Sequence, residues 1–172
     1  MNRHKVFLSH YNEDAEEVKK FVEYFDEEKE VFISKVVGDD YDTTINSDDS
    51  DYIMKKIRED YLTDSTVTIV LIGKNTHKRK YVDWEIASTI RNDTNNKRSG
   101  LIGILLPGRT KENTTIPPRL QDNVDCGYAE IRSYPSYSPD TLRNWIEDAF
   151  QRKDDDDYTV DNSRKLFSYN RS

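Results

Sequence analysis

The carboxylate of Glu85 has the clearest chemical potential in this sequence because of where its segment lies. The run Lys80-Tyr81-Val82-Asp83-Trp84-Glu85-Ile86 is expected to open a helix soon after a buried strand at 67–72. Open α/β sheets build their sites where such strands end and such helices begin. A carboxylate held there can stabilise positive charge that develops on a bound substrate.

Helical spacing divides this expected helix into two faces. Tyr81, Glu85 and Ser88 fall at i, i+4 and i+7 and share one face. The other face is mainly apolar and is expected to lie on the sheet; it consists of Val82, Ile86, Thr89 and Ile90. We therefore expect Glu85 to lie beside the core without being part of it. The competing interpretation is a solvated glutamate in the first turn, which the helix dipole favours.

Length, charge and cysteine content narrow the class of protein. The chain has 172 residues, so we expect one α/β domain at 1–152 and an acidic, polar tail at 153–172, either docked or disordered. The formal net charge of -7 argues against binding to nucleic acid. We expect neither a membrane span nor a secretion signal, because no apolar run approaches roughly 20 residues and Met1-Asn2-Arg3-His4-Lys5 leads straight into a short strand-like segment. A lone cysteine, Cys126, fits a reducing compartment, and we expect a cytoplasmic protein.

Short apolar runs alternate with helical stretches along the chain. Strands are expected at 5–9, 31–37, 67–72, 101–106 and 128–131. Helices are expected at 12–26, from about 51 to 62, from about 81 to 91, and at 139–152. Asn12-Glu13-Asp14 and Ser138 are expected to cap the first and last of these helices, and the acidic stretch 38–50 is expected to be a long loop.

This alternation predicts a single doubly wound α/β domain of the flavodoxin-like type. Its sheet is expected to be five-stranded and mainly parallel, with helices on both faces and strand order 2-1-3-4-5. In that order, ligands bind outside the carboxyl ends of strands one and three. Those ends carry Ser9, His10, Tyr11 and Asn12 on one side and Gly73-Lys74-Asn75 on the other.

Each of these residues also has a structural interpretation. Ser9 can satisfy backbone groups at the turn, a lone strand-end histidine such as His10 is more often structural, and Trp84 can serve packing. A phosphoacceptor receiver domain shares the topology, but it needs an aspartate where strand three here ends in Gly73. The acidic runs lack the spacing of a calcium loop, so no metal site is expected.

Three motifs resemble a known family. Val6-Phe7-Leu8-Ser9-His10-Tyr11-Asn12-Glu13-Asp14 resembles the opening of TIR and TIR-like domains, where a strand ends in a Ser-aromatic turn and an acidic residue follows. Tyr81-Val82-Asp83-Trp84-Glu85-Ile86 and Gly100-Leu101-Ile102-Gly103-Ile104 are similar to signatures of the TIR-like proteins of the bacterial Thoeris antiphage systems, the ThsB group. The resemblance covers about 5–106. It departs at Tyr81, where tryptophan is more usual, and at Lys80, where serine often stands.

The resemblance implies an activity. In enzymatic TIR domains the glutamate of this helix cleaves the nicotinamide–ribose bond of NAD, and Glu85 is the matching position. NAD is then a substrate rather than a cofactor, bound by Ser9, His10, Tyr11, Asn12, Lys74, Tyr81 and Trp84. The product would be an ADP-ribose-derived, cyclic signal that activates a partner effector.

The same resemblance implies self-assembly through TIR contacts and a phage-derived trigger. It leaves a second interpretation open, in which the chain is a non-catalytic adaptor. Such an adaptor would assemble through TIR–TIR contacts, with the loop 38–50 and helix surfaces as its interfaces.

Overall fold

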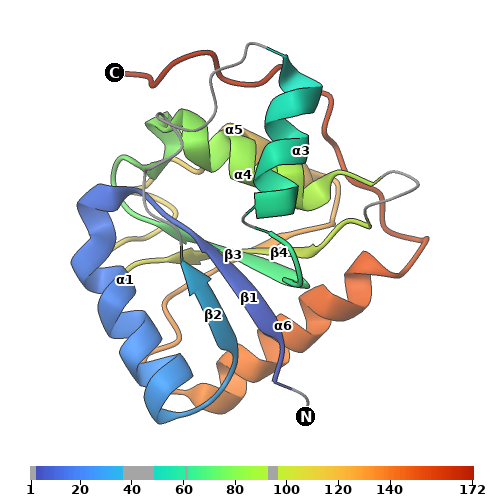
Figure 1. The fold of residues 1–172 in the computed structure, drawn as a ribbon. Coiled ribbons are helices and arrows are strands. Elements are labelled where there is room, and N and C mark those ends of the chain that lie inside the picture. The colour runs from blue at the N-terminus through green and yellow to red at the C-terminus, as the bar shows by residue number, and fades with distance from the viewer. Residues whose placement is uncertain (1–2, 37–48, 61, 93–96) are drawn as a thin grey trace.

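Five parallel strands form the centre of the computed structural model, which describes residues 3–36, 49–60, 62–92 and 97–172 (Figure 1). Every neighbouring pair of strands is parallel, and the order is β2-β1-β3-β4-β5. The expected doubly wound fold and strand order are confirmed. The bounds of the strands are β1 Lys5–Ser9, β2 Ile33–Val36, β3 Val67–Ile72, β4 Gly100–Leu105 and β5 Glu130–Arg132.

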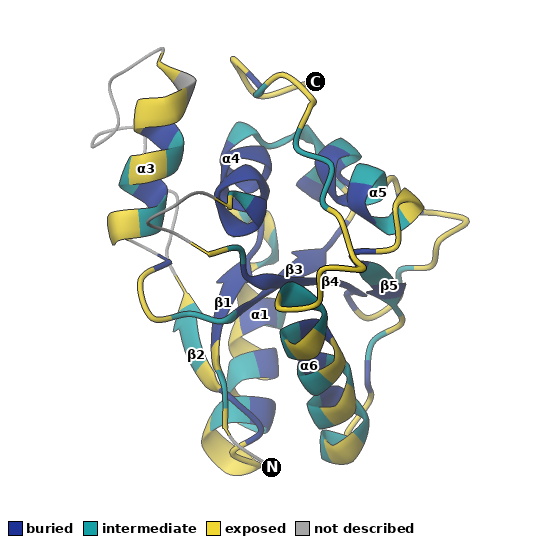
Figure 2. Ribbon diagram, turned by 90° about the vertical axis from the view of Figure 1, so that its right-hand side faces the viewer, coloured by how far each residue is buried: buried dark blue, intermediate teal, exposed yellow. Residues whose placement is uncertain are grey.

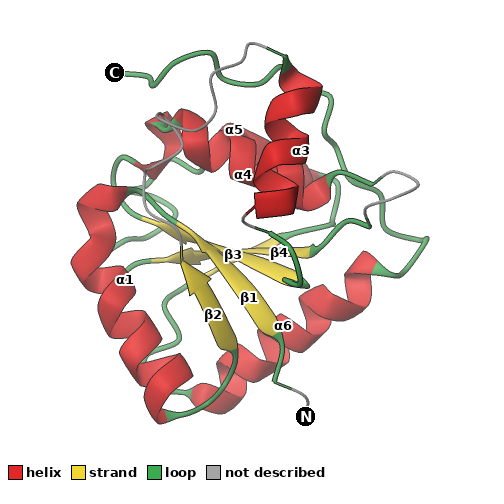
Figure 3. Cartoon of the chain, viewed as in Figure 1, coloured by secondary structure: helices red, strands yellow, loops and turns green. Residues whose placement is uncertain are grey.

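Helices cover both faces of this sheet (Figure 3). One face carries α1 Ala15–Val22 and α6 Pro139–Lys153, and the other carries α3 Ser50–Asp60, α4 Lys80–Ile90 and α5 Pro118–Asp125. Short 3-10 turns, Asn12–Asp14 and Thr76–Lys78, lie just before α1 and α4. A π-helical turn, Glu23–Glu28, extends α1.

The central strands are continuous apolar runs because helices lie on both of their faces. All six residues of β3 and all six of β4 are buried, whereas the edge strand β2 is exposed at both ends. This is the pattern of a parallel sheet enclosed between two helical layers.

Two glycines of β4 permit close packing on this sheet. A Cβ added at Gly100 would lie 2.5 Å from the backbone oxygen of Ala149 in α6. One added at Gly103 would lie 2.6 Å from Cδ1 of Ile131 and 2.9 Å from Cδ2 of Leu120. Packing against these neighbours therefore explains both glycines of the Gly-x-Ile-Gly-Ile run.

The expected helix bounds and caps need correction. The helix expected at 12–26 is a composite that continues to Glu28. Among the described residues Asp14 makes no side-chain capping bond to α1, and Glu13 instead accepts a hydrogen bond from Asn75 Nδ2 at 3.0 Å. Ser138 stands at the N-cap of α6, but its hydroxyl pairs with that of Thr141 at 2.7 Å rather than with the backbone.

The starts of two strands and the presence of one helix also differ from the expectation. The expected strands 31–37 and 128–131 begin too early, because the apolar residues at their starts are buried just ahead of β2 and β5. Helix α5 was not expected, since its sequence PRLQDNVD offers only Leu120 and Val124 as apolar anchors. Most of the expected acidic loop lies outside the described residues.

The described ranges contain no helix with the length and apolar character needed to cross a bilayer. They also contain no group of three or more His, Cys, Asp or Glu side chains arranged to hold a metal ion. The thiol of Cys126 is exposed.

Candidate active site

Ser9 and Glu85 meet where the carboxyl ends of the parallel strands lie. Ser9 is the last residue of β1, pairs with Val70 of β3, and donates a hydrogen bond from Oγ to Glu85 Oε1 at 2.9 Å. Both side chains are buried, and Glu85 is only 3 % exposed. A carboxylate is thus held by a hydroxyl at the edge where doubly wound sheets bind ligands.

The burial of Glu85 corrects two expectations. All residues of α4 from Tyr81 to Ile90 are buried (Figure 2), so the interpretation of Glu85 as a solvated glutamate is wrong. The apolar face of α4 packs on the sheet as expected, and Val82 and Ile86 lie in one cluster with residues of β3 and β4. The opposite face is covered as well, because α3 packs against it, and Glu85 lies within the core rather than beside it.

The aromatic neighbours of Glu85 have well-defined packing. The rings of Tyr81 and Trp84 meet edge to face with centroids 5.5 Å apart. Trp84 Nε1 donates to the backbone oxygen of Phe167 at 2.9 Å, which satisfies the indole. The ammonium of Lys80 lies 5.2 Å from the Tyr81 ring and 5.4 Å from the Trp84 ring. Trp84 is therefore packed and hydrogen-bonded in the structure, and its contact with a substrate stays a prediction.

The other expected site residues differ in exposure. His10 is buried and Tyr11 is half-buried, whereas Asn12 and Lys74 are exposed. The guanidinium of Arg79 lies 4.3 Å from the centroid of the Tyr11 ring. Sequence reasoning missed Arg79 because an arginine ahead of a helix carries no signal until its stacking partner is known.

The end of β3 is shaped by Asp14. Burial, and to a lesser degree the neighbouring charge of Glu13, raise the pKa of the Asp14 carboxyl. Its buried Oδ2 lacks a hydrogen-bond partner among the described residues. A Cβ at Gly73 would lie 2.3 Å from this Oδ2, so the Asp14 carboxyl would have to shift to admit a side chain there.

A buried ion pair lies on α4 beside the site. Arg119 of α5 donates from Nε to Asp83 Oδ1 at 2.9 Å and from Nη2 to Oδ2 at 3.3 Å. Arg119 also donates to Asn162 Oδ1 at 2.8 Å, and the backbone N–H of Phe167 donates to Asp83 Oδ2 at 2.9 Å. The sequence offered no sign of this pair, since Arg119 falls in a polar stretch that reads as a loop.

The chain after α6 returns across α5 to α4 (Figure 1). Asn162 Nδ2 donates to the oxygen of Ala87 at 3.1 Å. Further along, Asn170 Oδ1 accepts the N–H of Lys80 at 2.9 Å, and the N–H of Arg171 donates to the oxygen of Lys78 at 2.8 Å. These contacts bring the end of the chain to the first residues of α4.

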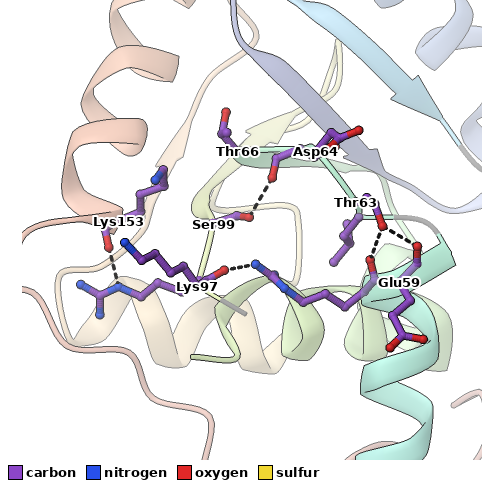
Figure 4. A pocket seen from close by; sticks show the side chains of 11 residues that line it. Glu59, Thr63, Asp64, Thr66, Lys97, Ser99 and Lys153 are labelled. Atoms are coloured by element: carbon purple, nitrogen blue, oxygen red, sulfur yellow. Dashed lines mark hydrogen bonds between the residues drawn. The ribbon is translucent and has the colours of Figure 1, made fainter. Parts of the chain in front are cut away.

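A pocket of about 340 Å³ lies at the opposite edge of the sheet, where β3 and β4 begin (Figure 4). Both arginines that line it donate to backbone oxygens. Arg58 Nη1 donates to the oxygen of Ser88 at 3.0 Å, and Arg98 Nε to that of Lys153 at 2.9 Å. These arginines therefore cap the carboxyl ends of α4 and α6, and their pocket lies away from Glu85.

Comparison with known proteins assigns the family. Residues 7–111, more than half of the chain, match the family described as Thoeris protein ThsB, TIR-like domain. No curated protein matches the sequence. The matched segment contains the end of β1 and all of β3, α4 and β4, and with them both Ser9 and Glu85. The chain therefore belongs to the Thoeris ThsB TIR-like domain family.

Proposed function

We propose that the chain cleaves the nicotinamide–ribose bond of NAD and makes an ADP-ribose-derived, cyclic signal that activates a partner effector in antiphage defence. The observation that carries this proposal is the buried hydrogen bond between Ser9 Oγ and Glu85 Oε1 at 2.9 Å. It joins two motifs far apart in the sequence at the edge of the sheet where ligands bind. Family membership supports the defence role.

The reaction asks for stabilisation of positive charge more than for proton transfer. When the bond between the ribose C1 and the nicotinamide nitrogen breaks, its electron pair leaves with nicotinamide, which departs neutral and needs no general acid. Positive charge then develops on the ribose, as in other oxocarbenium-like transition states. The Glu85 carboxylate would stabilise that charge and accept hydrogen bonds from the ribose hydroxyls.

Ser9 and the aromatic rings have supporting roles in this proposal. The Ser9 hydroxyl would hold one carboxylate oxygen in place, so the site loses less energy to reorganisation during the reaction. Tyr81 and Trp84 would exclude water, which favours attack on C1 by a nucleophile of the same nucleotide over hydrolysis. In that cyclisation the attacking atom bonds to C1 and its proton, where it has one, passes to solvent.

A non-catalytic adaptor is the second candidate, and one observation favours it. Glu85 is 3 % exposed, so a sugar cannot reach the carboxylate unless the surrounding structure opens. An adaptor that acts only by TIR–TIR assembly needs no such opening.

Nicotinamide release separates the two candidates. The purified chain would be incubated with NAD, with and without extract of phage-infected cells, and the products followed by chromatography and mass spectrometry. We expect Glu85→Gln, which keeps an acceptor for Ser9, to abolish release. Glu16→Gln is the matched control, because it removes the same charge from an exposed position of α1. Assembly without turnover under both conditions supports the adaptor.

A further inference from the structure

Residues 161–171, here called the strap, hold α4 by its first residues. Both backbone groups of Phe167 make hydrogen bonds to side chains of α4. The N–H of Phe167 donates to Asp83 Oδ2 at 2.9 Å, and its oxygen accepts from Trp84 Nε1 at 2.9 Å. Leu166 packs against the cluster that contains Tyr81 and Trp84. The strap thus grips the residues that immediately precede Glu85 in α4.

The end of the strap caps the amino end of α4. The first N–H groups of a helix point outward without partners in the helix. In this chain the N–H of Lys80, the first residue of α4, donates to Asn170 Oδ1 at 2.9 Å. An amide oxygen of the strap therefore satisfies a backbone donor at the start of the helix that carries Glu85.

The two ends of the strap are held with unequal strength. At the first end, Asn162 accepts a hydrogen bond from Arg119 of the buried Asp83–Arg119 pair. Asn162 also donates a hydrogen bond to the backbone oxygen of Ala87 in α4. Asn170 and Arg171 are exposed, and each makes one hydrogen bond to a backbone group of α4 or of the turn before it. The Arg171 guanidinium also lies 4.0 Å from the centroid of the Phe167 ring, a contact within the strap itself. Segments with few buried contacts open most readily, so the strap would peel from its end toward Phe167.

We infer that the strap is an autoinhibitory cover of the amino end of α4: residues 166–171 hold Trp84 and the first residues of α4 in the arrangement in which Glu85 is buried, and release of the strap lets this end of the helix move. This inference rests on the proposed function. It also resolves the observation that favoured the adaptor, because a buried Glu85 is what a covered site requires. Binding of a substrate that prefers the open form would shift the population toward it.

Two substitutions at one position test the cover in the full chain. Asn170→Ala removes the acceptor for Lys80, and we expect Glu85-dependent nicotinamide release to rise about fivefold, the factor that one net hydrogen bond contributes. Asn170→Asp keeps the acceptor and adds a negative charge at the amino end of α4, which strengthens closure, so release is expected to fall by about the same factor. Ser168→Ala, an exposed change in the same segment, is the matched control.

Amide exchange gives a readout that does not depend on turnover. The N–H of Lys80 and that of Phe167 should exchange faster in Asn170→Ala than in the Ser168→Ala control. The inference is overturned if exchange at both amides is unchanged, or if release remains the same or falls in Asn170→Ala while it still depends on Glu85. If neither the unaltered chain nor Asn170→Ala releases nicotinamide under any condition, the proposed function itself fails and the cover fails with it.

Discussion

The hydroxyl of Ser9 donates to the carboxylate of Glu85 at 2.9 Å, and both side chains are buried although 76 positions separate them in the chain. A hydrogen bond to a buried acceptor is costly to remove, because the acceptor loses its partner without regaining water. The pair therefore affects stability and, in the proposed enzyme, turnover.

Ser9→Ala should lower nicotinamide release by about tenfold or more, since a bond to a charged acceptor is worth roughly 1.5–3 kcal/mol. Glu85→Gln should abolish release whether or not the Ser9 hydroxyl is present, because the hydroxyl acts through the carboxylate. A double-mutant cycle on urea unfolding would measure the coupling of the two side chains. Additive effects of the two substitutions would contradict the pairing.

Breaking the buried pair between Asp83 and Arg119 should destabilise the fold strongly. With Arg119→Met we expect a loss of about 3–5 kcal/mol in the free energy of unfolding, because Asp83 remains as an uncompensated buried charge. Arg119→Met combined with Asp83→Leu should recover much of this loss. Urea denaturation would measure both variants, with Arg143→Met in α6 as a control at a more exposed arginine. Equal losses in single and double variants would show that charge is not the cause.

Gly100→Ala should destabilise the chain through close packing rather than through backbone conformation. The added Cβ would lie 2.5 Å from the backbone oxygen of Ala149, so β4 and α6 must move apart. Overpacking of this kind costs roughly 1–3 kcal/mol. Thermal unfolding would measure it, and Gly127→Ala, where open space surrounds the Cβ but φ is +85°, separates crowding from conformational strain. We expect the loss of stability to be larger for Gly100→Ala than for Gly127→Ala, and the reverse would contradict crowding as the main cause.

Asp14→Asn should raise stability at pH 7 and change it little at pH 3. Burial raises the pKa of this carboxyl above its usual 3.8. The protonated Asp14 carboxyl therefore contributes its full stabilisation below pH 3.8. This stabilisation is lost as the pH rises through the pKa of the folded state. An amide stays neutral throughout and avoids that loss. Melting temperatures from pH 3 to pH 7 would show the difference growing with pH, with Glu16→Gln, at an exposed position of α1, as the control for removing one carboxylate.

The fold was predictable from the sequence because its signals are local. The apolar runs that became β1, β3 and β4 are bounded by helical spacing, and alternation of strands and helices restricts the topology to few choices. The same reasoning failed at α5, whose polar sequence forms a helix only because Leu120 and Val124 pack against the α4 side of the sheet. It also placed Glu85 outside the core, since helical spacing cannot reveal that α3 covers the second face of α4.

By itself, the sequence determined that Ser9 and Glu85 would approach one another, because parallel strands bring their carboxyl ends to a common edge and α4 begins beside that edge. Only the tertiary structure decided that Glu85 is buried, that Asp83 pairs with Arg119, and that the strap closes over the first residues of α4. These features depend on which side chains meet across 36 or 84 positions of the chain. Such meetings are set by helix packing, about which local periodicity carries no information.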